Sequence, residues 1–339
     1  MKIFYDPRMV ADVASFSRSP AKPRGFVAAA MTDFAGAVTL EGFEPVGLED
    51  FRAVHDPAHV DAVWALQTPN GFGTTDAALN ESLRWTSGSV VAAALEAVAQ
   101  RAICCSPTSG FHHAGHAYSD GYCTFNGLVL AAMAVRRQRS GARVVVLDCD
   151  MHHGDGTEDL IRARGLDWLV NLSAGRHFDE QARQRPFLAW LDQQIAWINE
   201  QRPDLVLYQA GADAHRDDPL GGYLSDDGMS RRDAKVFRGI DPDIGIAWTL
   251  AGGYQKPRGE VNPVLALHLE TLRQALRAQR GRVLRGFRQA AGLSLADLAR
   301  RVEAPVAAVR RWEAGGLVPD AVAPLQALAA ELDLPLDLA

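Results

Sequence analysis

The sequence DCDMHHGDG, residues 148–156, directly follows the valine-rich run 143–147. A short apolar run of this kind is typical of a buried parallel strand. Ligands of an open α/β sheet bind beyond the carboxyl ends of its strands, so the carboxylates and imidazoles of 148–156 are expected at a functional site. Side chains alternate along an extended chain, and Asp150 and His152 therefore point to the same side. The pair predicts part of a metal site that needs a third ligand.

Strands and helices are expected to alternate through the rest of the larger part of the chain. Short apolar runs predict buried strands, and longer apolar-periodic segments predict helices. The expected strands are 102–105, 143–147, 168–172, 204–208 and 245–250, and the expected helices are 87–101, 127–139 and 186–201. This alternation indicates an α/β protein with a parallel sheet and helices on both faces.

The composition is that of a globular protein, with 47% hydrophobic and 22% charged residues in a chain of 339. The beginning of the chain lacks the apolar segment of a signal peptide, and no apolar run reaches the length of a membrane span. The four cysteines show neither CxxC nor disulfide-scaffold spacing. We therefore expect a cytoplasmic protein with no membrane partner.

The net charge changes sign near residue 276. Residues 1–276 hold 26 basic and 34 acidic side chains, whereas residues 277–339 hold 9 basic and 7 acidic ones. An acidic larger part is compatible with a cationic substrate. We expect two domains, 1–275 and 276–339, with a linker or a helix end at 277–281.

Three more polar clusters follow expected strands. His112 and His113 come after the first strand, Asp213 after the fourth and Tyr254 after the fifth. Each has an ordinary alternative: adjacent loop histidines are often structural, a lone aspartate often caps a helix, and a tyrosine often packs in a turn. Because all four clusters stand at strand ends of one sheet, we interpret them together as one active site.

These motifs resemble those of the histone deacetylase and acetylpolyamine amidohydrolase superfamily. The order His-His-Ala, Gly-Tyr-Cys-x-Phe-Asn, Asp-x-Asp-x-His-His-Gly-Asp-Gly, Gly-Ala-Asp-Ala-His, Asp-Pro-Leu-Gly-Gly and Gly-Gly-Tyr is the family's order. The resemblance covers roughly residues 1–275. It implies a three-layer arginase/deacetylase-like fold with a mainly parallel sheet, and hydrolysis of an acylated amine at a Zn²⁺ site, with Fe²⁺ as the alternative metal.

The resemblance also assigns roles by position. The implied metal ligands are Asp150, His152 and Asp213. The implied catalytic residues are the tandem histidines with their carboxylate partners and a carbonyl-polarising tyrosine: His112, His113, Asp148, Asp155 and Tyr254. His113 would move protons, His112 would give electrostatic support, and Tyr254 would stabilise the oxyanion together with the metal. The implied substrate-binding residues are Gly121, Tyr122 and Leu220.

One segment departs from the family pattern. The loop after strand 168–172 is short and lacks the usual stretch that walls the substrate channel, so Phe178 is the candidate replacement for an aromatic wall. Ser173 matches a ligand of a structural K⁺ ion.

The C-terminal part resembles the lambda-repressor-like helix-turn-helix family over 281–339. The motifs Leu-Ser-x-x-x-Leu-Ala and Trp-Glu-x-Gly carry the resemblance, and it implies a recognition helix at about 305–314. Candidate phosphate contacts are Arg300, Arg301, Arg310 and Arg311. The recognition helix begins with apolar residues, which do not read base edges, so DNA binding and a protein-contact or homodimer role both stay open.

Together these observations predict a metal-dependent deacetylase or amidohydrolase. It would hydrolyse an acyl amide of a lysine-like or polyamine amine and release acetate or another short acid. The alternative is a metal-containing small-molecule sensor domain that feeds a DNA-binding transcriptional regulator. A ureohydrolase with two metals is disfavoured, because Asp-Cys-Asp-Met-His and Gly-Gly-Tyr fit one metal better.

Overall fold

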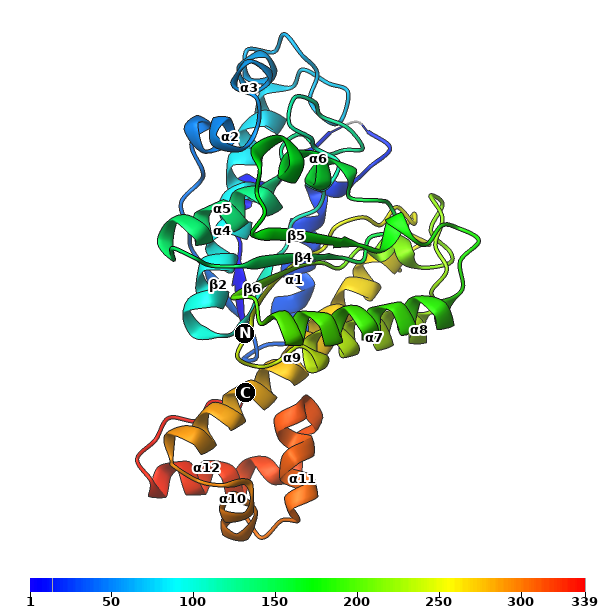
Figure 1. The fold of residues 1–339 in the computed structure, drawn as a ribbon. Coiled ribbons are helices and arrows are strands. Elements are labelled where there is room, and N and C mark those ends of the chain that lie inside the picture. The colour runs from blue at the N-terminus through cyan, green and yellow to red at the C-terminus, as the bar shows by residue number, and fades with distance from the viewer. Residues whose placement is uncertain (14, 339) are drawn as a thin grey trace.

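A parallel sheet of seven strands forms the centre of the larger part of the computed structural model, which describes residues 1–13 and 15–338 (Figure 1). The strand order is β2-β1-β3-β7-β6-β4-β5, and all pairings between neighbours are parallel. The strands are β1 (Lys2–Phe4), β2 (Thr39–Glu41), β3 (Ile103–Ser106), β4 (Val144–Asp148), β5 (Leu169–Ser173), β6 (Leu205–Gln209) and β7 (Gly245–Thr249). The five predicted strands are confirmed. The edge pair β1 and β2 was missed because three residues are too few to show a periodic pattern.

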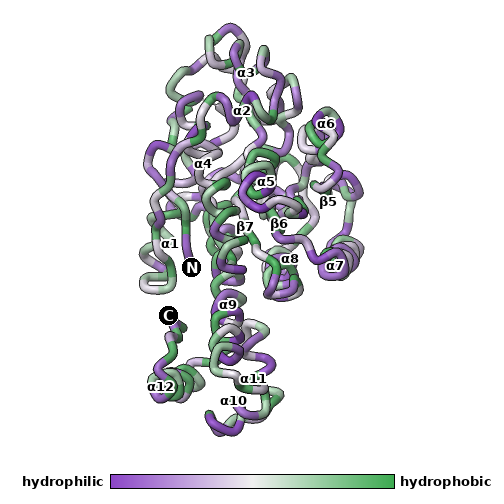
Figure 2. Tube along the Cα trace, turned by 60° about the vertical axis from the view of Figure 1, so that its left-hand side comes forward, coloured by the Kyte–Doolittle hydropathy of each residue, from purple (hydrophilic) through white to green (hydrophobic). Residues whose placement is uncertain are grey.

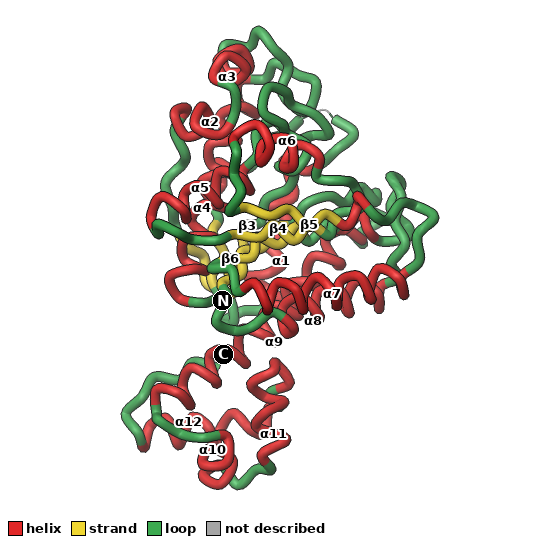
Figure 3. The backbone as a smooth tube through the Cα atoms, in the orientation of Figure 1, coloured by secondary structure: helices red, strands yellow, loops and turns green. Residues whose placement is uncertain are grey.

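Helices cover both faces of this sheet and enclose two apolar cores (Figure 3). Val145 and Leu147 of β4 enter one core, and Val144 and Val146 enter the other. The first core lies against α1 (Lys22–Asp33), α7 (Gln184–Gln201), α8 (Asp226–Gly239) and α9 (Pro263–Ala290). The second lies against α2 (Leu48–Val54), α3 (Pro57–Trp64), α4 (Ala77–Gln100), α5 (Gly127–Gln138) and α6 (Asp155–Arg164). The predicted three-layer α/β fold is confirmed.

The linker or helix end predicted at 277–281 is wrong, because these residues lie inside the 28-residue helix α9. Tertiary contacts hold this part of the helix. The side chain of Gln279 accepts a hydrogen bond from the N–H of Ile103 at 2.8 Å, and the buried guanidinium of Arg282 donates to the carbonyl oxygen of Ile244 at 2.7 Å. These bonds satisfy backbone groups at the amino ends of β3 and β7, so α9 continues past the sheet as a fixed element.

The C-terminal part is all-helical, as predicted, and shares α9 with the larger part (Figure 2). The last turns of α9 pack with α10 (Leu295–Arg301), α11 (Val306–Arg311) and α12 (Val322–Glu331) around a separate core. Leu284 and Phe287 of α9 are buried in that core. The predicted recognition helix corresponds to α11 and the π-turn 312–316 that follows it.

The remaining features concern membrane-spanning helices and the cysteines. Among the described residues, no helix is both long and apolar enough to cross a membrane. Cys104, Cys105, Cys123 and Cys149 are all buried free thiols.

We expect Gly281→Ala to destabilise the protein, although alanine favours helices by ~1 kcal/mol over glycine. A Cβ at Gly281 would lie 2.4 Å from the carbonyl oxygen of Glu313 and 2.7 Å from the backbone nitrogen of Gly315. This overlap with backbone should lower the free energy of unfolding by ~1–3 kcal/mol, measured by urea denaturation. Gly286→Ala in the same helix is the control, because its Cβ would meet nothing within 4 Å. If Gly281→Ala is as stable as Gly286→Ala, the packing of the π-turn on α9 is not as described.

Candidate metal centre and catalytic site

The predicted site residues lie at the carboxyl edge of the sheet. Strands β3, β7, β6 and β4 are consecutive neighbours and run in the same direction, so the loops that follow them are adjacent. These four loops carry the tandem histidines, Tyr254, Asp213 and the segment 148–155 in that spatial order. The topology therefore gathers residues at one place that are up to 142 positions apart in sequence, from His112 to Tyr254.

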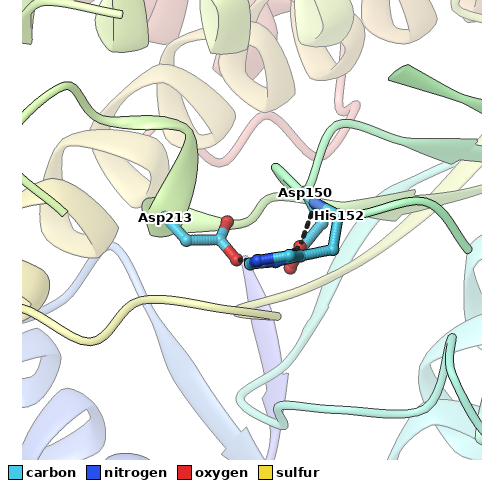
Figure 4. A group of neighbouring side chains, drawn as sticks. All are labelled: Asp150, His152 and Asp213. Atoms are coloured by element: carbon cyan, nitrogen blue, oxygen red, sulfur yellow. Dashed lines mark hydrogen bonds and ion pairs between the residues drawn. The ribbon is translucent and has the colours of Figure 1, made fainter. Parts of the chain in front are cut away.

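Asp150, His152 and Asp213 form the candidate metal centre (Figure 4). The Nδ1 atom of His152 lies 3.2 Å from Oδ1 of Asp150 and 3.2 Å from Oδ2 of Asp213. One ligand atom from each residue lies within 4.8 Å of the other two. The two aspartates are 1% and 0% exposed, whereas the His152 side chain is 33% exposed. The centre is therefore buried on the carboxylate side and open on the imidazole side.

Glycines allow the two carboxylates to approach each other. A Cβ at Gly252 would lie 1.9 Å from Oδ2 of Asp213, and a Cβ at Gly211 would lie 2.5 Å from its Oδ1. The N–H of Gly252 also donates to Oδ2 of Asp150 at 2.8 Å. Any side chain at these two strand ends would occupy the space of the carboxylates.

The charges of this group suit a divalent cation. Hydrogen bonds to Asp150 and Asp213 raise the pKa of His152 to about 11. Burial and the neighbouring Asp150 raise the pKa of Asp213 to about 7. The metal-free site therefore keeps protons that offset two buried carboxylates. Two carboxylates and an imidazole that faces them are a donor set that binds Zn²⁺ or Fe²⁺ and leaves further coordination positions open.

The tandem histidines beside this centre have different environments. Nδ1 of His112 lies 2.9 Å from Oδ2 of Asp148, and Nδ1 of His113 lies 2.7 Å from Oδ1 of Asp155. Burial alone would lower the pKa of His112, but Asp148 and Asp150 outweigh it and raise this pKa to about 9. Burial and the neighbouring His112 lower the pKa of His113. At neutral pH, His113 is thus the imidazole that can accept a proton.

Tyr254 stands between two aromatic rings. Its ring centroid lies 6.0 Å from that of Phe16 and 5.8 Å from that of Tyr122, and its N–H donates to Asp218 at 2.7 Å. Burial, followed by the charges of Asp213 and Asp150, raises the pKa of the Tyr254 hydroxyl. The hydroxyl therefore keeps its proton and remains a hydrogen-bond donor at neutral pH.

The three residues predicted to bind substrate line different parts of this region. Gly121 has φ +52° and packs on His113, because a Cβ there would lie 2.4 Å from its imidazole Cδ2. Tyr122 follows with φ +63° and contacts the Tyr254 ring. Leu220 is 38% exposed and donates its N–H to Asp218.

Phe178, the candidate replacement for the missing channel wall, is partly buried, and its role as a wall stays a prediction. Its ring packs on those of Phe187, Trp190 and Tyr223 at centroid distances of 5.7–6.0 Å, against the core beside α7. The short β5–α7 loop brings Gly175 directly against the backbone of His152. The hydroxyl of Ser173 lies 3.4 Å from Oδ2 of Asp148, and a structural K⁺ ion there stays a prediction.

Sequence reasoning missed two cations of the site, one buried and one partly buried. Arg232 of α8 is fully buried and donates to the carbonyl oxygens of Cys149 and Gly211, thereby joining the loops that carry the aspartates. Lys22 at the start of α1 donates to the carbonyl oxygen of Ala251 at 2.8 Å. Neither residue follows a strand or belongs to an apolar pattern, so their positions gave no signal.

The arginines predicted to contact DNA divide into two pairs. Arg300 and Arg301 form exposed ion pairs with Asp297 at 2.9 Å and Glu331 at 3.2 Å. Arg310 and Arg311 are exposed on α11, and none of the ion pairs among the described residues involves them.

Comparisons with known proteins agree with both parts of the chain. A family model described as the histone deacetylase domain matches residues 26–166 and 162–270, and one described as a helix-turn-helix domain matches residues 279–338. An uncharacterized protein of Picosynechococcus is 26% identical over 229 residues, which are 60% of this chain and 74% of that protein. Histone deacetylase 2 of Arabidopsis thaliana is 31% identical over 178 residues, which are 45% of this chain and less than half (44%) of the plant protein.

A solved structure supports the fold. The acetylpolyamine aminohydrolase from Burkholderia pseudomallei matches with a TM-score of 0.62 at 20% identity, over 81% of this chain and 97% of that one. The predicted arginase/deacetylase-like fold with a C-terminal helix-turn-helix domain is confirmed. The division at 275/276 stays a prediction, because α9 runs through it.

We expect His152→Ala to lose tight zinc binding and His153→Ala to keep it, because His153 lies outside the Asp150–His152–Asp213 group. Zinc must replace the proton of His152, so binding at pH 7 should release about one proton or more per chain, and affinity should increase as the pH rises. Calorimetric titration in buffers of different ionisation enthalpy measures this release. Equal zinc content in the two variants, or binding without proton release, would contradict the assignment.

Proposed function

Since the chain belongs to the histone deacetylase domain family, we propose that it is a zinc-dependent amidohydrolase that removes a short acyl group from a lysine-like or polyamine amine. Hydrolysis of acyl amides is the reaction class that the family and the site support. The observation that carries the proposal is the Asp150–His152–Asp213 group beside two histidines of opposite pKa shift. Fe²⁺ is the alternative metal.

The candidate metal ligands and catalytic residues have different roles in the proposed hydrolysis. Asp150, His152 and Asp213 would hold the metal, which when bound would lower the pKa of a water molecule from ~15.7 to ~7 and polarise the carbonyl. His113, held through Nδ1 by Asp155, accepts the proton of the attacking water and returns it to the amine when the C–N bond breaks. His112, paired with Asp148, stays positively charged and stabilises the developing negative charge. Tyr254 donates its hydroxyl proton in a hydrogen bond to the same oxyanion.

We expect His113→Ala and Tyr254→Phe each to reduce kcat for an acetyl-lysine peptide or acetylpolyamine by ~10²–10⁴-fold. Zinc content should stay at the parent value, because neither residue belongs to the group that holds the metal. Steady-state kinetics of the zinc-loaded protein measure the loss. Tyr5→Phe is the control, because the charges that act on the Tyr5 hydroxyl are those of Arg24 and Asp6 and not those of the candidate catalytic residues.

The outcome also separates an enzyme from a sensor. Parent-like turnover in either variant would show that the catalytic roles are assigned wrongly. Tight binding of amides by the zinc-loaded parent without any hydrolysis would favour the alternative, a metal-containing sensor that feeds the helix-turn-helix domain.

We also propose that the helix-turn-helix domain binds duplex DNA. The supporting observation is that Arg310 and Arg311 lie exposed on α11 without a carboxylate partner among the described residues, so their charges are available to phosphates. Val306 at the start of α11 is 40% exposed and offers no hydrogen bond to a base edge. Binding would therefore depend mainly on the DNA backbone, and a homodimer would present two such helices.

We expect the parent to bind duplex DNA weakly at low salt and much more weakly at moderate salt, because phosphate contacts release counterions. Arg310→Gln/Arg311→Gln should reduce the slope of log K against log[salt] by ~2. Fluorescence anisotropy titrations at several salt concentrations measure both effects. Arg183→Gln/Arg185→Gln removes the same charge from exposed positions in the larger part and should leave binding unchanged. No binding at low salt would instead favour a protein-contact role.

A further inference from the structure

A basic pocket of 290 Å³ lies beside Tyr254, and Tyr122 is not among the residues that line it. Its walls come from the segment before α1, which contributes Phe16 and Arg18, and from the loop before α9, which contributes Lys256. Lys22 and Tyr254 line it as well. The volume is close to the ~300 Å³ at which small-ligand sites begin.

The charged side chains that line the pocket are all basic. Arg18, Lys22 and Lys256 line it, and none of its lining residues is acidic. Among the described residues, neither Arg18 nor Lys256 forms an ion pair. Lys22 differs, because the carboxylates of Asp213, Asp150 and Asp218 act on its ammonium group. The unbalanced charge therefore belongs to Arg18 and Lys256.

The same pocket adjoins the reacting groups. Tyr254 stacks on Phe16 with 24° between the ring planes, so one face of the proposed oxyanion donor forms a pocket wall. Gly253 lies between the pocket and the metal centre, because a Cβ there would be 2.9 Å from Ala212, next to Asp213, and 3.6 Å from Nζ of Lys22. A single glycine backbone thus separates the pocket from the loop that holds a candidate metal ligand.

We propose that this pocket binds a carboxylate carried by the substrate, so that the preferred substrates are amides of short dicarboxylic acids, such as succinyl or glutaryl amides. The inference rests on the proposed amidohydrolase function and specifies its acyl group. Arg18 and Lys256 bind the distal carboxylate, and Phe16 packs on the intervening methylene groups. The reaction balances as a hydrolysis: water adds to the acyl carbon, the C–N bond breaks, the amine takes the proton, and the dicarboxylic acid leaves.

The test compares two amides of one peptide lysine, N-acetyl and N-succinyl, with the zinc-loaded full-length protein. The parent should hydrolyse the succinyl amide with a kcat/KM at least ~10-fold higher, as expected for charge-assisted hydrogen bonds. Arg18→Gln/Lys256→Gln should abolish this preference through KM and change acetyl hydrolysis less than ~2-fold. The control Arg24→Gln/Arg216→Gln removes two exposed charges outside the pocket and should keep the preference.

A second arm identifies the source of the carboxylate without relying on turnover. Calorimetric titration with glutarate and with acetate should show glutarate binding in the parent and in the control, and loss of binding in Arg18→Gln/Lys256→Gln. If acetate binds equally well and depends on the same residues, the pocket holds the released acid, and the dicarboxylic class is wrong. Acetyl hydrolysis without a succinyl preference would overturn this inference and leave the proposed function intact. No hydrolysis of either amide would overturn the function itself.

Discussion

Two buried carboxylates that face each other are the constraint on which this structure depends. Asp150 and Asp213 are almost completely excluded from solvent, and the imidazole of His152 is their common polar neighbour. Two negative charges that share one neighbouring imidazole are unfavourable in a protein interior unless a positive charge lies between them. The site must therefore hold a proton or a metal ion, and this alternative links metal binding to pH.

The scaffold around the carboxylates is built to keep them together. Their loops begin at the neighbouring strands β4 and β6, and the guanidinium of Arg232 binds a backbone carbonyl from each loop. Asp233 pairs with this guanidinium and accepts a hydrogen bond from Thr271 of α9 at 2.6 Å. The buried network thus continues from the metal loops into the helix that leads to the C-terminal domain. Removal of one charged side chain from this network would leave a buried charge without its partner. This would lower the free energy of unfolding more than the loss of a surface ion pair does.

Helix α9 also determines how the two parts can act together. The candidate site lies beyond the carboxyl ends of the strands, whereas Gln279 and Arg282 of α9 bind backbone groups at the amino ends of β3 and β7. The 28 residues of the helix span ~42 Å at 1.5 Å per residue. The helix-turn-helix domain thus lies at the far end of α9, below the larger part of the chain in Figures 1 and 2. DNA bound to α11 as proposed would lie away from the candidate catalytic site of the same chain.

The sequence by itself determined the α/β class, the five longer strands, the group of strand-end polar residues and the helical nature of the C-terminal part. These features are local, because apolar periodicity and motif spacing are written in consecutive residues. The tertiary structure decided what depends on residues far apart in the chain. Gly281 suggested a helix end, but the π-turn at Glu313 needs a residue without a side chain there, and α9 continues. Phe178 was the candidate for a channel wall, and only the fold shows that its partly buried ring packs against Phe187 and Tyr223 beside α7. Arg18, Lys22 and Lys256 carry no common pattern, and they meet because the segment before α1 folds over the loop before α9.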